Sequence, residues 1–125
     1  MDLTAFKKRW LETFAPDIPA KDIKRYVVST GNYIWHVFSW ELLPDGAYLV
    51  GDAARAAYDQ ADKRGAMYIE PFGKGATKSI TWDLDKASAL DNMTEVYVVA
   101  SDNSWTYIKT HENDWCGPYF LRKSK

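Results

Sequence analysis

Titratable and aromatic side chains lie close together near the C-terminal end of the sequence. Residues 105–112 read Trp-Thr-Tyr-Ile-Lys-Thr-His-Glu, and strand alternation would place Trp105, Tyr107, Lys109 and His111 on one face. Because Tyr and Trp combine a large contact area with a polar atom, a strand that carries them beside titratable groups could line a groove. An aromatic ladder between neighbouring strands, with a solvent-exposed edge, explains these residues equally well. The candidate binding residues are Trp105, Tyr107, His111, Glu112, Trp115 and Tyr119.

The single cysteine, Cys116, follows His111 by five residues. A thiolate needs a neighbouring base or cation to form near neutral pH, and these two side chains could meet across a turn. The sequence supplies no recognisable oxyanion hole, however, and no orienting group beyond Glu112 or Asp114. A lone cysteine among aromatic residues is more typical of packing, so we predict no catalytic residue.

Metal-binding and phosphate-binding motifs are incomplete. The zinc-protease pattern needs a second histidine one helical turn after the His111-Glu112 pair, and position 115 is Trp. The other histidine, His36, lies in an apolar stretch, where we expect a hydrogen-bonded core residue. Residues 73–79 contain the glycines and lysine of a phosphate-binding loop, but Lys74 is followed by glycine instead of Ser or Thr. The sequence therefore predicts neither a metal nor another cofactor.

Composition and charge exclude several classes of protein. A chain of 125 residues is enough for one domain, here residues 1–125, with a single core. Sixteen basic residues against 17 acidic ones argue against binding nucleic acid through bulk charge. No apolar stretch approaches the ~18 residues of a membrane helix, and the first residues carry no apolar signal segment. Together with the single cysteine, these features predict a cytoplasmic protein without a membrane span.

Helical spacing is clearest at two places. Apolar residues at helical intervals predict a helix over 3–14, capped by Asp2 or Thr4, and a shorter helix over 20–26 follows. Small residues predict a second long helix over 53–63, which begins after Asp52 and ends before Gly65. An Asp59/Lys63 pair would lie on the solvent-exposed side of this helix. Residues 83–91 fit either a loop or a short helix.

Strand patterns dominate the rest of the chain. Residues 33–40 are aromatic or β-branched on both faces and predict a central strand, while 67–70 and 78–82 predict strands around a glycine turn. Residues 95–101 and 105–112 form a hairpin signal, and 117–122 add a third strand. The expected fold is α+β, with N-terminal helices packed on a mostly antiparallel sheet that ends in a β-meander. The expected aromatic core residues are Phe6, Trp10, Phe14, Trp35, Phe38 and Trp82.

Negative charge is concentrated in two segments. Residues 41–62 hold five acidic side chains against Arg55 alone, and residues 83–102 hold five against Lys86 alone. If the two segments share a face, they would steer a basic partner towards it. The ordinary alternative is solvated helix and loop surface.

Several short motifs resemble those of a small bacterial family of unknown function. Its C-terminal signature is matched by Ser104-Trp105-Thr106-Tyr107, Thr110-His111-Glu112 and Gly117-Pro118-Tyr119-Phe120. The Phe38-Ser39-Trp40 triplet and the segment 47–58, with Gly51, Asp52 and Ala57, fit the same pattern. The resemblance implies a bacterial cytosolic origin and one domain, and it assigns no catalytic role to any residue.

Two classes of function follow as hypotheses. The leading one is a protein-binding module, an immunity or antitoxin-like protein that neutralises a partner toxin by direct binding. The alternative is a small-ligand-binding protein or enzyme with a cleft lined by aromatic residues, His and Glu in the C-terminal strands. Binding of single-stranded nucleic acid through stacked aromatic residues is disfavoured, because basic residues are absent beside most Trp positions.

Overall fold

In a computed structural model of the chain, helices cover both faces of one sheet. The structure describes residues 1–44, 46–73, 75–112 and 117–123. The helical elements are α1 (Leu3–Phe14), α2 (Ala20–Asp22), the π-helix η1 (Ile23–Val27), the 3-10 helices η2 (Val28–Thr30) and η3 (Trp82–Leu84), α3 (His36–Ser39), α4 (Asp52–Gln60) and α5 (Ala87–Leu90). The strands are β1 (Tyr48–Val50), β2 (Met67–Ile69), β3 (Lys78–Ser79), β4 (Val96–Val99), β5 (Trp105–Lys109) and β6 (Tyr119–Arg122). The α+β prediction is confirmed.

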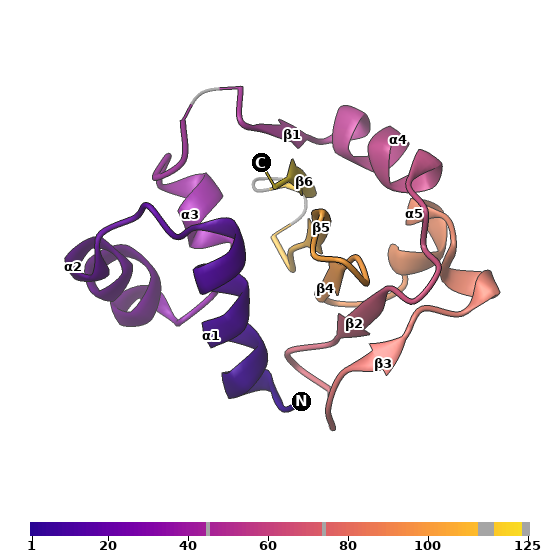
Figure 1. The fold of residues 1–125 in the computed structure, drawn as a ribbon, viewed down its shortest axis with the longest axis horizontal. Helices are drawn as coiled ribbons and strands as arrows, with labels where there is room; N and C mark the ends of the chain where they lie inside the picture. The colour runs from indigo at the N-terminus through magenta and orange to yellow at the C-terminus, as the bar shows by residue number, and fades with distance from the viewer. Residues whose placement is uncertain (45, 74, 113–116, 124–125) are drawn as a thin grey trace.

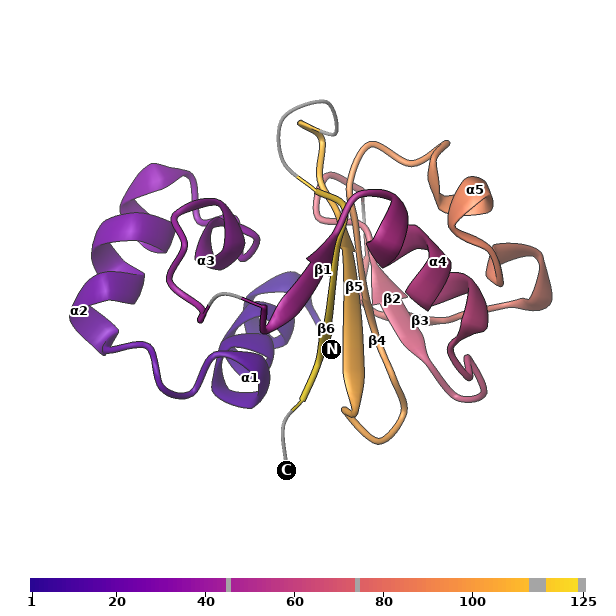
Figure 2. The same cartoon turned by 90° about the horizontal axis from the view of Figure 1, so that it is seen from above.

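The described strands form an antiparallel sheet in the order β1-β6-β5-β4-β2-β3. The C-terminal strands β4, β5 and β6 are consecutive neighbours, so the predicted meander is present. Figures 1 and 2 show α1, α2 and α3 on one face of the sheet and α4 and α5 on the other. No helix among the described residues is long and apolar enough to cross a membrane.

Helix α1 forms as its spacing predicts. The Asp2 carboxylate caps it by accepting a hydrogen bond from the backbone N–H of Ala5 at 2.8 Å. Phe6, Trp10 and Phe14 are buried against the sheet. The Trp10 indole N–H donates to the Thr106 hydroxyl at 2.9 Å, which fixes α1 over β5.

The sheet separates two hydrophobic cores, so its central strands are apolar on both faces. Along β4, Tyr97 faces the core under α1 and α3, whereas Val96 and Val98 face the core under α4 and α5. The same alternation places Ile108 of β5 in the first core and Tyr107 in the second. Successive residues of β4 and β5 therefore alternate between the two cores.

The prediction of a strand over 33–40 is wrong, because these residues form a turn followed by helix α3. A short, mainly apolar run has too little periodicity to separate a buried strand from a buried helix. Here Ile34, Val37 and Phe38 reach the core at helical spacing, after Gly31 and Asn32 adopt positive φ angles. His36 accordingly lies on a short helix and is half-buried.

Trp82 is the other clear departure from the sequence prediction. Its side chain is 90% exposed at the start of η3 instead of lying in the core. The strand predicted over 78–82 ends at Ser79, so the alternation that would have buried Trp82 does not continue to it. Residues 83–91, for which loop and helix both remained open, contain the rest of η3 and helix α5.

Candidate functional site

The predicted binding residues lie on two different faces of the sheet. Trp105 and Tyr107 point into the core beneath α4, where their rings lie 5.9 and 4.6 Å from the Tyr58 ring. Both are almost fully buried, so the aromatic ladder explains them better than an open groove does. Burial raises the pKa of the Tyr107 hydroxyl, which therefore stays protonated at neutral pH.

Tyr119 and His111 lie on the opposite face. The Tyr119 ring stacks on Phe38 at 4.4 Å and is buried. The expectation that His111 shares a face with Trp105 and Tyr107 is wrong, since β5 ends at Lys109 and the alternation stops there. His111 and Glu112 are exposed, while Trp115 and Cys116 lie outside the described residues. The structure therefore does not bring the described candidates together into one cleft.

A buried carboxylate that the sequence analysis did not single out organises the surroundings of His111. The Glu95 side chain is fully buried. Its Oε1 accepts hydrogen bonds from the Trp35 indole N–H and from the His111 backbone N–H, each at 3.0 Å. Its Oε2 accepts from the Tyr97 hydroxyl. These donors compensate for the loss of water around the carboxylate.

The His111 ring is held by the same carboxylate. Its Nδ1 lies 2.7 Å from Glu95 Oε1, whereas Nε2 is 4.0 Å from the exposed Glu112 carboxylate. The ring lies 5.0 Å from the Tyr33 ring and 5.2 Å from the Phe72 ring. An imidazole whose Nδ1 is fixed by a carboxylate presents its other nitrogen in a defined direction for binding or proton transfer. We call these two residues the Glu95–His111 pair.

A second imidazole lies in the same aromatic surroundings. The His36 ring is 5.6 Å from the Tyr33 ring and 4.4 Å from the Trp35 ring, and its Nδ1 lies 2.6 Å from the Thr30 hydroxyl. Burial lowers the pKa of His36, against the opposing effect of nearby carboxylates. No group of three His, Cys, Asp or Glu side chains suited to a metal ion occurs in the described part of the chain.

A signal for Glu95 exists in the sequence but is weak. Glu95 directly precedes an apolar strand, and Tyr97 follows it two residues later on the other side of the strand from Val96. Glu95 appeared in the sequence only as part of an acidic segment. Its partner Trp35 is 60 residues away, so no local pattern reveals the contact.

The two acidic segments meet on the α4–α5 side of the sheet. Arg55 of α4 forms an ion pair with Asp91, and the Asp59 carboxylate accepts a hydrogen bond from the Ala87 backbone N–H at 2.8 Å. Several of the carboxylates are paired with nearby cations, which reduces the field that the sequence alone suggests. Arg64, for example, holds Asp62 through its guanidinium and lowers the pKa of that exposed carboxyl to about 2.

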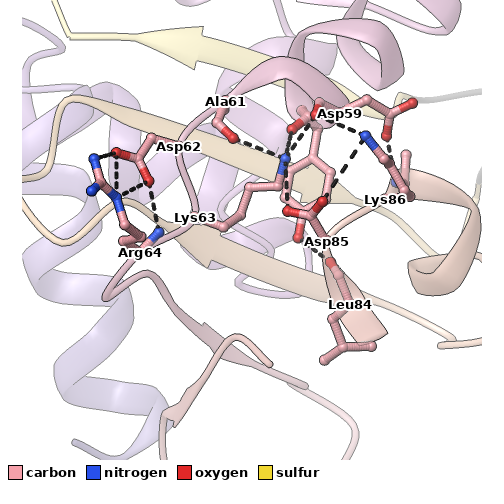
Figure 3. Close-up of polar contacts among 10 residues, drawn as sticks. Asp59, Ala61, Asp62, Lys63, Arg64, Leu84, Asp85 and Lys86 are labelled. Carbon is pink, nitrogen blue, oxygen red and sulfur yellow. Dashed lines mark hydrogen bonds and ion pairs between the residues drawn. The ribbon is translucent and has the colours of Figure 1, made fainter. Parts of the chain in front are cut away.

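Lys63 occupies the centre of this polar region (Figure 3) and does not form the predicted solvent-exposed pair with Asp59. Its ammonium donates to the backbone carbonyls of Asp59 at 3.1 Å and Ala61 at 2.9 Å, and also to that of Tyr58. Asp85 lies 3.5 Å from the ammonium, and the Tyr58 ring lies beneath it. Burial lowers the pKa of Lys63, an effect that Asp85 opposes. Lys63 thus satisfies carbonyls that the end of α4 leaves free.

Comparison with known proteins identifies the class of this chain. Residues 3–120 match the model of a domain of unknown function (DUF4275), and the chain belongs to that family. No curated protein and no solved structure matches it.

Proposed function

We propose that this protein acts by binding another protein through its α4–α5 side, with Trp82 at the centre of the contact. The observation that carries the proposal is the 90% exposure of the Trp82 side chain beside Asp83. Tryptophan is prominent among residues that contribute strongly to protein association, because it buries a large area on contact. An indole that contacts almost nothing in the free protein retains that area for a partner.

Charge on the same side supports a partner with a basic surface. Asp83 is exposed next to the indole, and Asp52 is exposed at the start of α4. Since local cations pair with several other carboxylates here, we expect the charges to speed association and select the partner more than they add affinity.

The narrower form of the proposal is an immunity or antitoxin-like role in the bacterial cytoplasm. Small cytosolic chains of unknown function often neutralise a toxin encoded beside them, which is an argument by analogy. A basic, nuclease-type toxin is the partner that the acidic side chains favour.

Capture from the native host, with the product of the adjacent gene present, tests the proposal. We expect a protein partner that Trp82→Ala weakens by about 30-fold or more. Trp40→Ala is the matched control, because Trp40 is 51% exposed and packs against Tyr26 on the other side of the sheet. Equal effects of both substitutions, or recovery of no protein partner, would refute the proposal.

A second candidate function rests on the Glu95–His111 pair. The defined direction of the His111 ring, between Tyr33 and Phe72, favours a small polar ligand or a proton-transfer step at its Nε2 atom. A thermal-shift screen of small molecules tests this candidate. A ligand whose stabilising shift is lost in His111→Ala but kept in Glu112→Gln supports it, and a shift that both variants keep contradicts it.

A further inference from the structure

A separate cavity lies under α1, away from both regions described above. It has a volume of about 220 Å³ and lies between α1 and the end of the sheet at the β4–β5 turn. Phe6, Trp10 and Phe14 of α1 form one wall, and Met67 of β2 and Val99 of β4 contribute to the other. Its size is below the ~300–1,000 Å³ of pockets that hold drug-sized molecules, so it suits a smaller ligand.

The interior of the cavity offers apolar contact and few free polar atoms. The Trp10 indole N–H, its most prominent polar group, already donates to Thr106. The Met1 carbonyl accepts a hydrogen bond from the Thr77 backbone N–H at 2.9 Å, which ties the start of the chain to the segment before β3 and closes one side. The body of a ligand in this space would therefore be hydrocarbon.

The mouth of the cavity is polar and carries a positive charge. Among the described residues that line it, Arg9 has the one charged side chain, and Ser101 and Asn103 add a hydroxyl and an amide. Arg9 is exposed, and within the described ranges no ion pair joins it to a carboxylate. One unpaired guanidinium beside hydrogen-bond donors suits a singly charged carboxylate.

We propose that this cavity binds a small amphiphilic monocarboxylate, with its alkyl body between α1 and the sheet and its carboxylate at Arg9. Trp82, Glu95 and His111 are not among the described residues that line the cavity.

The three methionines of the chain provide a direct readout. Met1 and Met67 line the cavity, whereas Met93 packs against the core on the other face of the sheet. With methionine methyl groups labelled for NMR, octanoate should shift the Met1 and Met67 signals saturably and leave the Met93 signal in place. Octylammonium, with the same tail and the opposite charge, should bind several-fold more weakly.

Two variants on α1 test the role of the charge. Arg9→Gln should weaken octanoate binding by about fivefold, since the guanidinium is partly solvated. Lys8→Gln, an adjacent exposed cation outside the cavity lining, should leave the affinity unchanged, as should Trp82→Ala. The proposal is overturned if Met67 shows no saturable shift, if octylammonium binds as tightly as octanoate, or if Arg9→Gln and Lys8→Gln behave alike.

Discussion

Glu95 and Lys63 each carry a charge that lies away from water, but different kinds of atoms compensate the two charges. The Glu95 side chain is 0% exposed and that of Lys63 is 5% exposed. Lys63 is surrounded mainly by backbone carbonyls from residues two to five positions before it, at the end of α4, and the Asp85 carboxylate lies 3.5 Å away. Glu95 is bound by the nearby Tyr97 hydroxyl and by groups from distant parts of the chain, including Trp35, 60 residues away.

The difference separates a local structural device from a candidate site. A lysine that caps the end of its own helix stabilises that helix and needs no further role. Glu95 depends on the completed fold, and through the His111 ring it connects the interior to a titratable group at the surface. A carboxylate held in this way is costly to remove, and it orients a group that a ligand can reach.

The largest effect is expected from removing the buried anion. Glu95→Ala leaves the Trp35, Tyr97 and His111 donors without an acceptor and opens a cavity, so the free energy of unfolding should fall by about 3–5 kcal/mol. Urea denaturation measures the loss. Glu112→Ala, which removes an exposed carboxylate, should cost less than about 0.5 kcal/mol. Similar losses in both variants would show that Glu95 is not the organising residue.

Removing the buried cation should have a smaller effect. Lys63→Met keeps the packing of the side chain but leaves the carbonyls at the end of α4 without their donor, and we expect a loss of about 2 kcal/mol in the same denaturation experiment. Arg64→Met is the matched control, because the Arg64 side chain is 92% exposed. If Lys63→Met were as destabilising as Glu95→Ala, the distinction between the two buried charges would lose its basis.

His111→Ala should lower the free energy of unfolding by less than Lys63→Met does. Glu95 still accepts from the Trp35 indole, the Tyr97 hydroxyl and the backbone N–H of residue 111, so about 1 kcal/mol is the expected loss. A double-mutant cycle with Glu95→Ala isolates the contribution of the ring. We expect a favourable coupling between the two side chains, and strictly additive losses would contradict their pairing.

The smallest predicted effect is the change in folding stability with pH that His36 causes. Because burial lowers the pKa of His36 in the folded state, the unfolded chain binds a proton there more readily. Stability should therefore fall as pH drops through about 6.5, the ordinary histidine value, towards the folded pKa. Because the His36 side chain is half-exposed, its contribution to the free energy of unfolding is limited to about 0.5 kcal/mol. His36→Gln should lose less stability than the parent between pH 7.5 and 5.5; an equal loss in both proteins would contradict the assignment.

The sequence predicts those elements whose pattern is local. The apolar spacing of α1, its Asp2 cap and the hairpin of β4 and β5 are encoded within a few residues of one another, and all are present in the structure. The strand predicted over 33–40 fails because a short, mainly apolar segment has too little periodicity to distinguish a strand from a helix. The pattern of apolar residues in a segment does not show which other parts of the chain will pack against that segment.

The candidate site is less predictable for a related reason. The sequence identifies His111 as a candidate but predicts the wrong face for it, because alternation holds only while the strand continues and β5 ends at Lys109. The sequence indicates only that Glu95 belongs to an acidic segment, although its environment is the opposite of a solvated surface. Both outcomes depend on contacts between residues far apart in the sequence, which only the folded chain reveals.

The strand order also has a consequence for the synthesis of the chain. Strands β1, β2 and β3 are translated before β4, β5 and β6, yet β1 pairs with β6 and β2 requires β4 to join the sheet. During translation, the helices and outer strands therefore emerge before the centre of the sheet exists. The aromatic residues of α1 and α3 have no sheet to cover them until residues 96–122 leave the ribosome. Folding must wait for these last strands, and the nascent chain exposes an aromatic surface that chaperones would recognise.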